Sequence, residues 1–300
     1  MTPELNRREF LQAGTAAMAG AVFAGSTIAA ESKTREIKKA VNLAMVGEGK
    51  TVADKFKLLK ELGFDGVELN RPGGSPMKQL LEARDATGLQ ISNVVDSVHW
   101  DKTLSDPNPE VRAKGLKGLE SALTDAKELG ASSVLLVPAV VNKQVSYADA
   151  YKRSQEEIRK AVPLAKKLGV PIAIENVWNN FLLSPVEAAR YVDEFKSKSV
   201  AFHFDVGNII HYGWPEHWIR ALGKRIVCLH IKEYSRAKSD KQGKWAGFSA
   251  ELLDGDNDWP AVMKALDEIG YKGWGVAEVG GGDAKRLKDI AERMDKIFAS

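Results

Sequence analysis

The chain has 300 residues, of which 44% are hydrophobic and 28% charged, and its formal net charge is +3. This composition suits a globular protein with a sizeable core and excludes an intrinsically disordered chain. Because lysines and arginines are interleaved with acidic residues and form no basic stripe, we expect no nucleic-acid partner. The length fits one α/β barrel, which commonly needs roughly 250 residues.

The first thirty residues have the pattern of an export signal. The pair Arg7 and Arg8 precedes Phe10, Leu11 and an Ala/Gly-rich apolar stretch that reaches Ala30. This pattern is typical of a twin-arginine signal peptide. We therefore expect a signal at residues 1–30, a folded domain at 31–300, the twin-arginine export machinery as a partner, and a periplasmic location. Membrane anchoring by an uncleaved signal is the alternative, although the stretch is only weakly hydrophobic.

From residue 41 onward, short apolar runs typical of strands alternate with amphipathic stretches typical of helices. The predicted strands are 41–46, 66–69, 91–95, 133–137, 172–174, 200–204, 226–231 and 274–277. Predicted helices include 52–62, 77–87, 109–129, 147–168 and 185–195. Several helices end at a glycine, as a left-handed C-cap requires: Gly63, Gly88, Gly130, Gly169 and Gly270.

Eight βα units predict an α/β fold, either a closed (β/α)8 TIM barrel or an open doubly wound sheet. An open sheet usually carries a Gly-rich phosphate loop after its first strand. The segment 45–50, with Gly47 and Gly49, lacks the full spacing of such a loop. The sequence therefore favours the single-domain TIM barrel.

Ionisable residues end four consecutive predicted strands in the second half of the chain. They are Glu175, Asp205, His230 and Glu278. The carboxyl ends of parallel strands meet at one face of a barrel, so we expect the four side chains to share one site. Any one of them alone would be more ordinary as a helix cap or an ion-pair partner.

Three carboxylates and one imidazole form an oxygen-rich ligand set. Such a set suits one divalent metal ion of the Mn²⁺, Mg²⁺ or Co²⁺ kind, whereas zinc usually takes more nitrogen or sulfur. The sequence thus predicts a metal cofactor at the carboxyl ends of the strands.

Several segments at strand ends resemble the xylose isomerase-like barrels, which include ketose 3-epimerases, hydroxypyruvate isomerases, inosose dehydratases and endonuclease IV. The resemblance spans nearly the whole chain after the signal. Its carriers are GFDGVEL at 63–69, IEN at 174–176, HFDVGN at 203–208, HIKE at 230–233 and AE at 277–278.

The resemblance implies that Glu175, Asp205, His230 and Glu278 hold one divalent metal, with Glu175 and Glu278 also acting as catalytic acid and base. It implies an isomerase that removes a proton next to a carbonyl and passes through a cis-enediolate. Return of the proton to the same carbon from the opposite face inverts it, as in a ketose 3-epimerase. Return to the adjacent carbon would give an isomerase, and the sequence barely separates these two outcomes. The expected substrate is a small carbohydrate, and the sequence leaves room for an oligomer.

Further residues are expected to bind the substrate: Arg236, Asn208, His99, Lys232 and Trp178. Arg236 matches an arginine that the resembling enzymes use on the substrate. Asn208 stands where many 3-epimerases have histidine, and segment 178–181 replaces a family glutamate. We therefore expect this chain to recognise the sugar end differently.

Other polar residues receive plainer interpretations. Glu68 ends a strand and is interpreted as the anchor of a neighbouring loop. His211 and His217 are interpreted as structural residues of a Tyr/Trp/Pro-rich loop. The segment 233–258 is either a lid over the site or a charged solvated loop, and the second interpretation is the simpler one.

Two other functions compete with the epimerase. A metal-dependent dehydratase of a keto-polyol, of the inosose or dehydroshikimate type, would use the same proton abstraction but expel hydroxide. A non-catalytic exported carbohydrate-binding barrel is disfavoured because both acid/base glutamates are present. A nuclease like endonuclease IV would need more than the five histidines of this chain.

Overall fold

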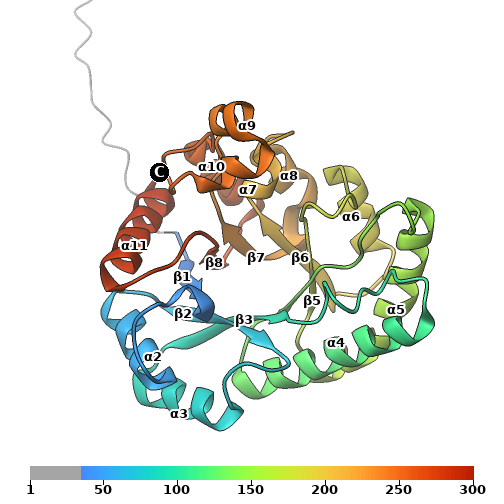
Figure 1. Ribbon diagram of the computed structural model, residues 1–300, viewed down its shortest axis with the longest axis horizontal. Helices are drawn as coiled ribbons and strands as arrows, with labels where there is room; N and C mark the ends of the chain where they lie inside the picture. The colour runs from blue at the N-terminus through green and yellow to red at the C-terminus, as the bar shows by residue number, and fades with distance from the viewer. Residues whose placement is uncertain (1–34) are drawn as a thin grey trace, which may run out of the picture. The chain divides into compact units, whose positions relative to one another are not determined.

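A computed structural model describes residues 35–300, so the expected signal at 1–30 lies outside the described residues. Eight parallel strands pair in the order β1-β2-β3-β4-β5-β6-β7-β8 and close into a barrel. Helices surround the barrel, as Figure 1 shows. The predicted TIM barrel is confirmed. Within residues 35–300, no helix is long and apolar enough to cross a membrane.

The strands are β1 (Ile37–Asn42), β2 (Gly66–Arg71), β3 (Gln90–Asp96), β4 (Val134–Leu136), β5 (Ile172–Glu175), β6 (Val200–Asp205), β7 (Ile226–Ile231) and β8 (Gly273–Ala277). The α-helices are α2 (Val52–Glu61), α3 (Met77–Thr87), α4 (Pro109–Leu129), α5 (Tyr147–Leu168), α6 (Pro185–Asp193), α7 (Gly207–Ile210), α8 (Pro215–Leu222), α9 (Arg236–Gln242), α10 (Trp259–Ile269) and α11 (Ala284–Ala299). The 3-10 helices are η1 (Leu43–Met45), η2 (Gly223–Arg225) and η3 (Lys244–Ser249).

The first strand begins earlier than predicted, and the assignment of a strand to 41–46 was wrong. β1 includes Lys38 and Lys39, whose aliphatic stems pack in the strand while their ammonium groups reach its surface. The Lys38 ammonium lies over the Trp274 ring, and that of Lys39 pairs with Asp295 at 2.6 Å. The strand stops at Asn42, whose side chain accepts a hydrogen bond from the Ala44 amide and starts η1.

The predicted glycine caps are confirmed. Five glycines end helices with positive φ angles: Gly63, Gly88, Gly130, Gly169 and Gly270.

The loop expected around His211 and His217 contains α8, whose buried face includes Trp218, Ile219 and Leu222. These caps and buried faces fix where each helix turns back toward the barrel.

The strand register places the candidate ligands at one end of the barrel. Asp205 pairs with His230 across β6 and β7, while Glu278 follows β8 and its amide donates to the Ile231 carbonyl at 3.1 Å. Glu175 is the last residue of β5. The apolar core that fixes these positions fills the barrel and the space under the helices.

Candidate metal centre and active site

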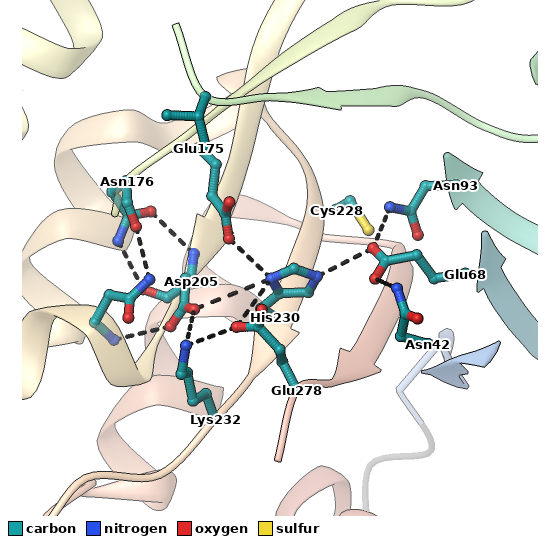
Figure 2. Close-up of polar contacts among 12 residues, drawn as sticks. Asn42, Glu68, Asn93, Glu175, Asn176, Asp205, Cys228, His230, Lys232 and Glu278 are labelled. Atoms are coloured by element: carbon teal, nitrogen blue, oxygen red, sulfur yellow. Dashed lines mark hydrogen bonds and ion pairs between the residues drawn. The ribbon is translucent and has the colours of Figure 1, made fainter. Parts of the chain in front are cut away.

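The structure brings the four predicted ligands together. Glu175, Asp205, His230 and Glu278 each offer a ligand atom, and these atoms all lie within 4.8 Å of one another. The Nδ1 atom of His230 lies 2.9 Å from Glu175 Oε1, 3.6 Å from Glu278 Oε2 and 4.0 Å from Asp205 Oδ2. Figure 2 shows the carboxylates converging on this one nitrogen.

A divalent cation fits this cluster. Asp205 is fully buried, and its Oδ1 accepts a hydrogen bond from the Asn208 amide at 2.8 Å. Its Oδ2 has no hydrogen-bond partner within residues 35–300, although the Lys232 ammonium lies 3.4 Å away. A buried carboxylate oxygen without a partner is costly, and a metal ion in an oxygen-rich ligand set would satisfy it.

His230 lies between two carboxylates. Burial favours the neutral imidazole, but the charges of Glu68 and Glu278 and hydrogen bonds to Glu68 and Glu175 raise the pKa of His230 well above its usual value. The imidazole therefore carries protons on both nitrogens in this arrangement. A metal ligated by Nδ1 would replace the proton that faces Glu175.

Glu68, interpreted from the sequence as a strand-end residue that anchors a neighbouring loop, contacts His230 instead. Its Oε2 lies 3.1 Å from Nε2 of His230, on the side opposite the cluster. Asn42 donates to Oε1 at 2.8 Å and Asn93 donates to Oε2 at 2.5 Å. It is the third residue of β2, between Val67 and Leu69, and a carboxylate inside a buried strand was a usable signal because it needs a polar partner.

The two candidate acid/base residues differ in their electrostatic surroundings. Burial raises the pKa of Glu175 above its usual value. Burial also opposes ionisation of Glu278, but the charges of His230 and Lys232 prevail and lower its pKa to about 2. Two carboxyl groups with pKa values pushed apart are the arrangement that general acid and general base roles require.

Lys232 directly follows β7 and reaches the cluster. Its ammonium lies 2.7 Å from Glu278 Oε2, and 4.7 Å from the centroid of the Phe248 ring. The aliphatic part of the side chain passes over Gly207, where a Cβ atom would lie 2.8 Å from it. Glycine at 207 is therefore needed for Lys232 to reach the site.

Asparagines tie the ends of β5 and β6 together. Asn176 donates to the Asp205 carbonyl at 2.8 Å and accepts from the Asp205 amide at 2.9 Å. Asn208 donates to the Asn176 carbonyl, and its own carbonyl accepts from the Trp178 indole at 2.8 Å. Asn208 and Trp178, both predicted to bind substrate, thus also hold the frame of the site.

His99 has a defined tautomer. Its Nδ1 accepts a hydrogen bond from the Val137 amide at 3.2 Å, which places the proton on Nε2. Burial lowers the pKa of His99 to about 4, so the imidazole is neutral at physiological pH. The edge of its ring packs against Trp100 with centroids 5.6 Å apart. A neutral imidazole in this position can donate one hydrogen bond to a ligand.

A cavity of about 870 Å³ opens over the cluster. Its lining includes three of the four candidate ligands, Glu175, His230 and Glu278. It also includes four of the residues predicted to bind substrate: His99, Trp178, Asn208 and Lys232. Asp205 lies buried beneath them. The segment 233–258 is ordered as α9 and η3, and η3 contributes Trp245 and Phe248 to the lining. The segment is therefore not a simple solvated loop, and the interpretation as a lid stays a prediction.

Arg236 does not join the other predicted residues. Its guanidinium donates to the Ile210 carbonyl at 2.9 Å and to the Gly213 carbonyl at 3.1 Å. It lies 6.0 Å from the centroid of the Trp214 ring and is not among the described residues that line the cavity. The spacing from His230 was suggestive, but the backbone carbonyls of a neighbouring loop hold the side chain here.

The chain belongs to the xylose isomerase-like TIM barrel family, whose model matches residues 56–297. Among curated proteins it is 25% identical over 239 residues to an L-ribulose-5-phosphate 3-epimerase of Escherichia coli O1:K1, covering 75% of this chain and 81% of that protein. The relatives found in this way are sugar 3-epimerases.

Solved structures share the fold over most of the chain. A D-tagatose 3-epimerase-like protein matches with a TM-score of 0.73 at 22% identity, covering 87% of this chain and 98% of that one. An L-ribulose 3-epimerase matches with a TM-score of 0.72 at 17% identity, covering 87% and 94%. These solved structures thus show that the chain shares their barrel fold.

Proposed function

We propose that this protein is a divalent-metal-dependent sugar epimerase of the ketose 3-epimerase kind. The observation that carries the proposal is the placement of Glu175 and Glu278. They come from β5 and from the end of β8, approach His230 from different directions, and have pKa values displaced in opposite senses. The 3-epimerase activity of the relatives supports an isomerase in this chain.

A divalent cation held by Glu175, Asp205, His230 and Glu278 would act as a Lewis acid on the sugar carbonyl. Glu278, which is ionised beside Lys232, removes the proton from the carbon next to that carbonyl. Glu175, in its protonated form at that stage, returns a proton to the same carbon from the other face. The configuration inverts and no atom is lost. In the reverse direction the two glutamates exchange roles.

Other residues orient the sugar. The Nε2–H group of His99 is free to donate to a substrate oxygen, because Nδ1 is occupied by the Val137 amide. Lys232 holds the Glu278 carboxylate at 2.7 Å. These contacts restrict the geometry in which the proton can be removed.

The test is solvent exchange. Protein loaded with Mn²⁺ is incubated in D₂O with a panel of ketoses, keto-sugars and inososes and followed by NMR. We expect deuterium at one carbon with inversion at that carbon, and loss of turnover in Glu175→Gln but not in the exposed control Glu61→Gln. Deuterium at the neighbouring carbon would mean an isomerase, and release of water a dehydratase. Binding without exchange would mean a carbohydrate-binding barrel.

We also propose that the protein is exported by the twin-arginine route. The support is the sequence alone: Arg7 and Arg8 followed by Phe10, Leu11 and a weakly apolar stretch. Changing both arginines to lysine should keep the protein in the cytoplasm, as measured by fractionation. An unchanged periplasmic fraction would reject the route.

A further inference from the structure

One side of the cavity is aromatic, and the proposed proton transfer does not use it. Trp178, Trp245 and Phe248 form an aromatic wall, with ring centroids 4.8 Å apart for Trp178 and Trp245 and 4.7 Å for Trp178 and Phe248. Trp178 comes from the segment after β5, and the other two rings come from η3. The wall therefore joins segments distant in sequence.

The wall is held in place by the chain beneath it. The ring of Tyr234 packs 4.9 Å from Phe248 and 5.7 Å from Trp178, and its hydroxyl donates to the Lys244 carbonyl at 2.7 Å. A Cβ atom at Gly247 would lie 2.4 Å from the Tyr234 ring, so η3 can approach this closely only with glycine there. The Ser235 amide donates to the Gly247 carbonyl at 2.9 Å. The rings are thus presented in a fixed arrangement.

Part of the aromatic surface faces water. Trp245 is 62% exposed, and Trp100, which also lines the cavity beside His99, is 50% exposed. Exposed aromatic area at the mouth of a site favours a ligand that covers it. The indole nitrogen of Trp178 is already bonded to the Asn208 carbonyl, so the wall offers ring faces more than hydrogen bonds.

The charges around the cavity disfavour an anionic extension of the substrate. Among the described residues that line it, Lys232 is the only lysine or arginine, and its ammonium pairs with Glu278 and Asp205. Glu68, Glu175 and Glu278 add carboxylates to the lining. At the mouth, Lys244 lies over the rings of Trp178 and Trp245, 5.6 and 5.4 Å from their centroids. No lysine or arginine of the described lining is left unpaired for a phosphate.

The cavity is also larger than one free sugar requires. Its volume of about 870 Å³ lies near the top of the range of ~300–1,000 Å³ that encloses drug-sized ligands. The volume therefore leaves room for more than a monosaccharide at the four-ligand cluster.

We propose that the substrate is a keto-sugar joined by a glycosidic bond to a second, neutral sugar ring. The keto ring lies at the Glu175, Asp205, His230 and Glu278 cluster, and the second ring stacks on Trp245 and its neighbours in the aromatic wall. A sugar ring presents C–H groups on its faces and hydroxyls at its rim, which suits a flat aromatic surface open to water at its edge. This inference rests on the proposed function, because it places the reacting ring at that site.

The test compares two substrates on the Mn²⁺-loaded protein: a disaccharide oxidised to a ketone on one ring, and the methyl glycoside of the same keto-monosaccharide. Solvent exchange by NMR gives kcat/KM for each. We expect the wild-type protein to prefer the disaccharide at least tenfold, and Trp245→Ala to reduce that ratio at least fivefold. Trp214→Ala is the matched control, because Trp214 is 58% exposed but lies outside the described lining. It should keep the wild-type ratio.

The inference would be overturned if the wild-type protein had equal kcat/KM for the two substrates. It would also be overturned if Trp245→Ala left the ratio of the two kcat/KM values unchanged, or if the protein preferred a ketose phosphate. If neither substrate showed solvent exchange, the proposed reaction would be rejected. Disaccharide affinity measured by calorimetry would then test the inference about the second sugar ring separately. Disaccharide affinity that falls at least fivefold in Trp245→Ala would support it, and equal affinity in the two proteins would overturn it.

Discussion

Glu68 lies behind His230, with its Oε2 atom 3.1 Å from the Nε2 atom of the imidazole. Because Nε2 is engaged on that side, Nδ1 must face the carboxylates of the cluster, where Glu175 Oε1 lies 2.9 Å away. Asn42 and Asn93 in turn hold Glu68 by their amide groups. Carboxylates in this position orient a ligating histidine and increase its basicity.

Replacing Glu68 by glutamine should weaken metal binding without removing a ligand. Glutamine has one carboxamide oxygen, whereas Asn42, Asn93 and His230 all donate to the present carboxylate. We expect the Mn²⁺ affinity measured by isothermal titration calorimetry to fall about 10- to 100-fold. The exposed control Glu61→Gln should bind Mn²⁺ as the wild type does. Unchanged affinity in Glu68→Gln would refute a positioning role.

Metal binding should stabilise the folded protein, and Asp205 should be required for it. A ligand present at 100 times its Kd stabilises a protein by about 2.7 kcal/mol if it binds only the folded state. We expect Mn²⁺ to raise the melting temperature accordingly, and EDTA to reverse the shift. In Asp205→Asn the shift should vanish, because the unpartnered Oδ2 is replaced. A full Mn²⁺-dependent shift in Asp205→Asn would contradict the proposed ligand set.

Asp96 should make stability fall as pH rises. Burial raises the pKa of this carboxyl to about 7, although the Val98 amide opposes the shift. The unfolded carboxyl ionises near pH 4, whereas the folded one keeps its proton until about pH 7. Between those values ionisation favours the unfolded chain, so the free energy of unfolding decreases by up to about 4 kcal/mol and levels off above pH 7.

Asp96→Asn removes this pH dependence, because asparagine does not ionise and can still accept from the Val98 amide. Urea unfolding at pH 4.5, 6 and 8 should therefore find the variant increasingly more stable than the wild type. The exposed control Asp101→Asn should follow the wild-type curve. A constant difference between Asp96→Asn and the wild type at all three pH values would disprove the assignment.

Glu233 should be essential for the order of the segment that carries the aromatic wall. Its buried carboxylate accepts hydrogen bonds from the amides of Tyr234, Leu253 and Asn257, from the Asn257 side chain and from the Trp259 indole. Glu233→Ala leaves these buried donors without a partner, and we expect a loss of about 3–5 kcal/mol in the free energy of unfolding by urea. The exposed helical control Glu128→Ala should change it by less than about 0.5 kcal/mol.

The four candidate ligands in the second half of the chain could be predicted because each directly follows an apolar run of sequence. In a barrel, the chain order of strands fixes their neighbours, so strand-end residues such as Asp205 and His230 must meet. That logic does not reach Glu68, which lies inside β2, and nothing local in the sequence indicates that its carboxylate turns inward to His230. That orientation depends on Asn42 and Asn93, which lie on two other strands.

Features that depend on contacts between loops could not be predicted from the sequence. The aromatic wall joins Trp178 to Trp245 across a long stretch of chain, and no spacing rule connects them. Arg236 matched a family spacing, yet the Ile210 and Gly213 carbonyls hold it away from the cavity lining. The start of β1 was misplaced because two lysines contribute to a strand through their aliphatic stems.

The paired bonds between Asn176 and the backbone of Asp205 make the ends of β5 and β6 move as one body. Three of the four candidate ligands are buried: the side chains of Asp205, His230 and Glu175 are 0%, 3% and 7% exposed, whereas that of Glu278 is 42% exposed. An ion of different radius would be accommodated most easily by displacement of Glu278, the most exposed of the four and the residue to which we assign proton removal. Exchanging the metal would therefore alter the position of the base, and with it the rate, more than the strength of binding.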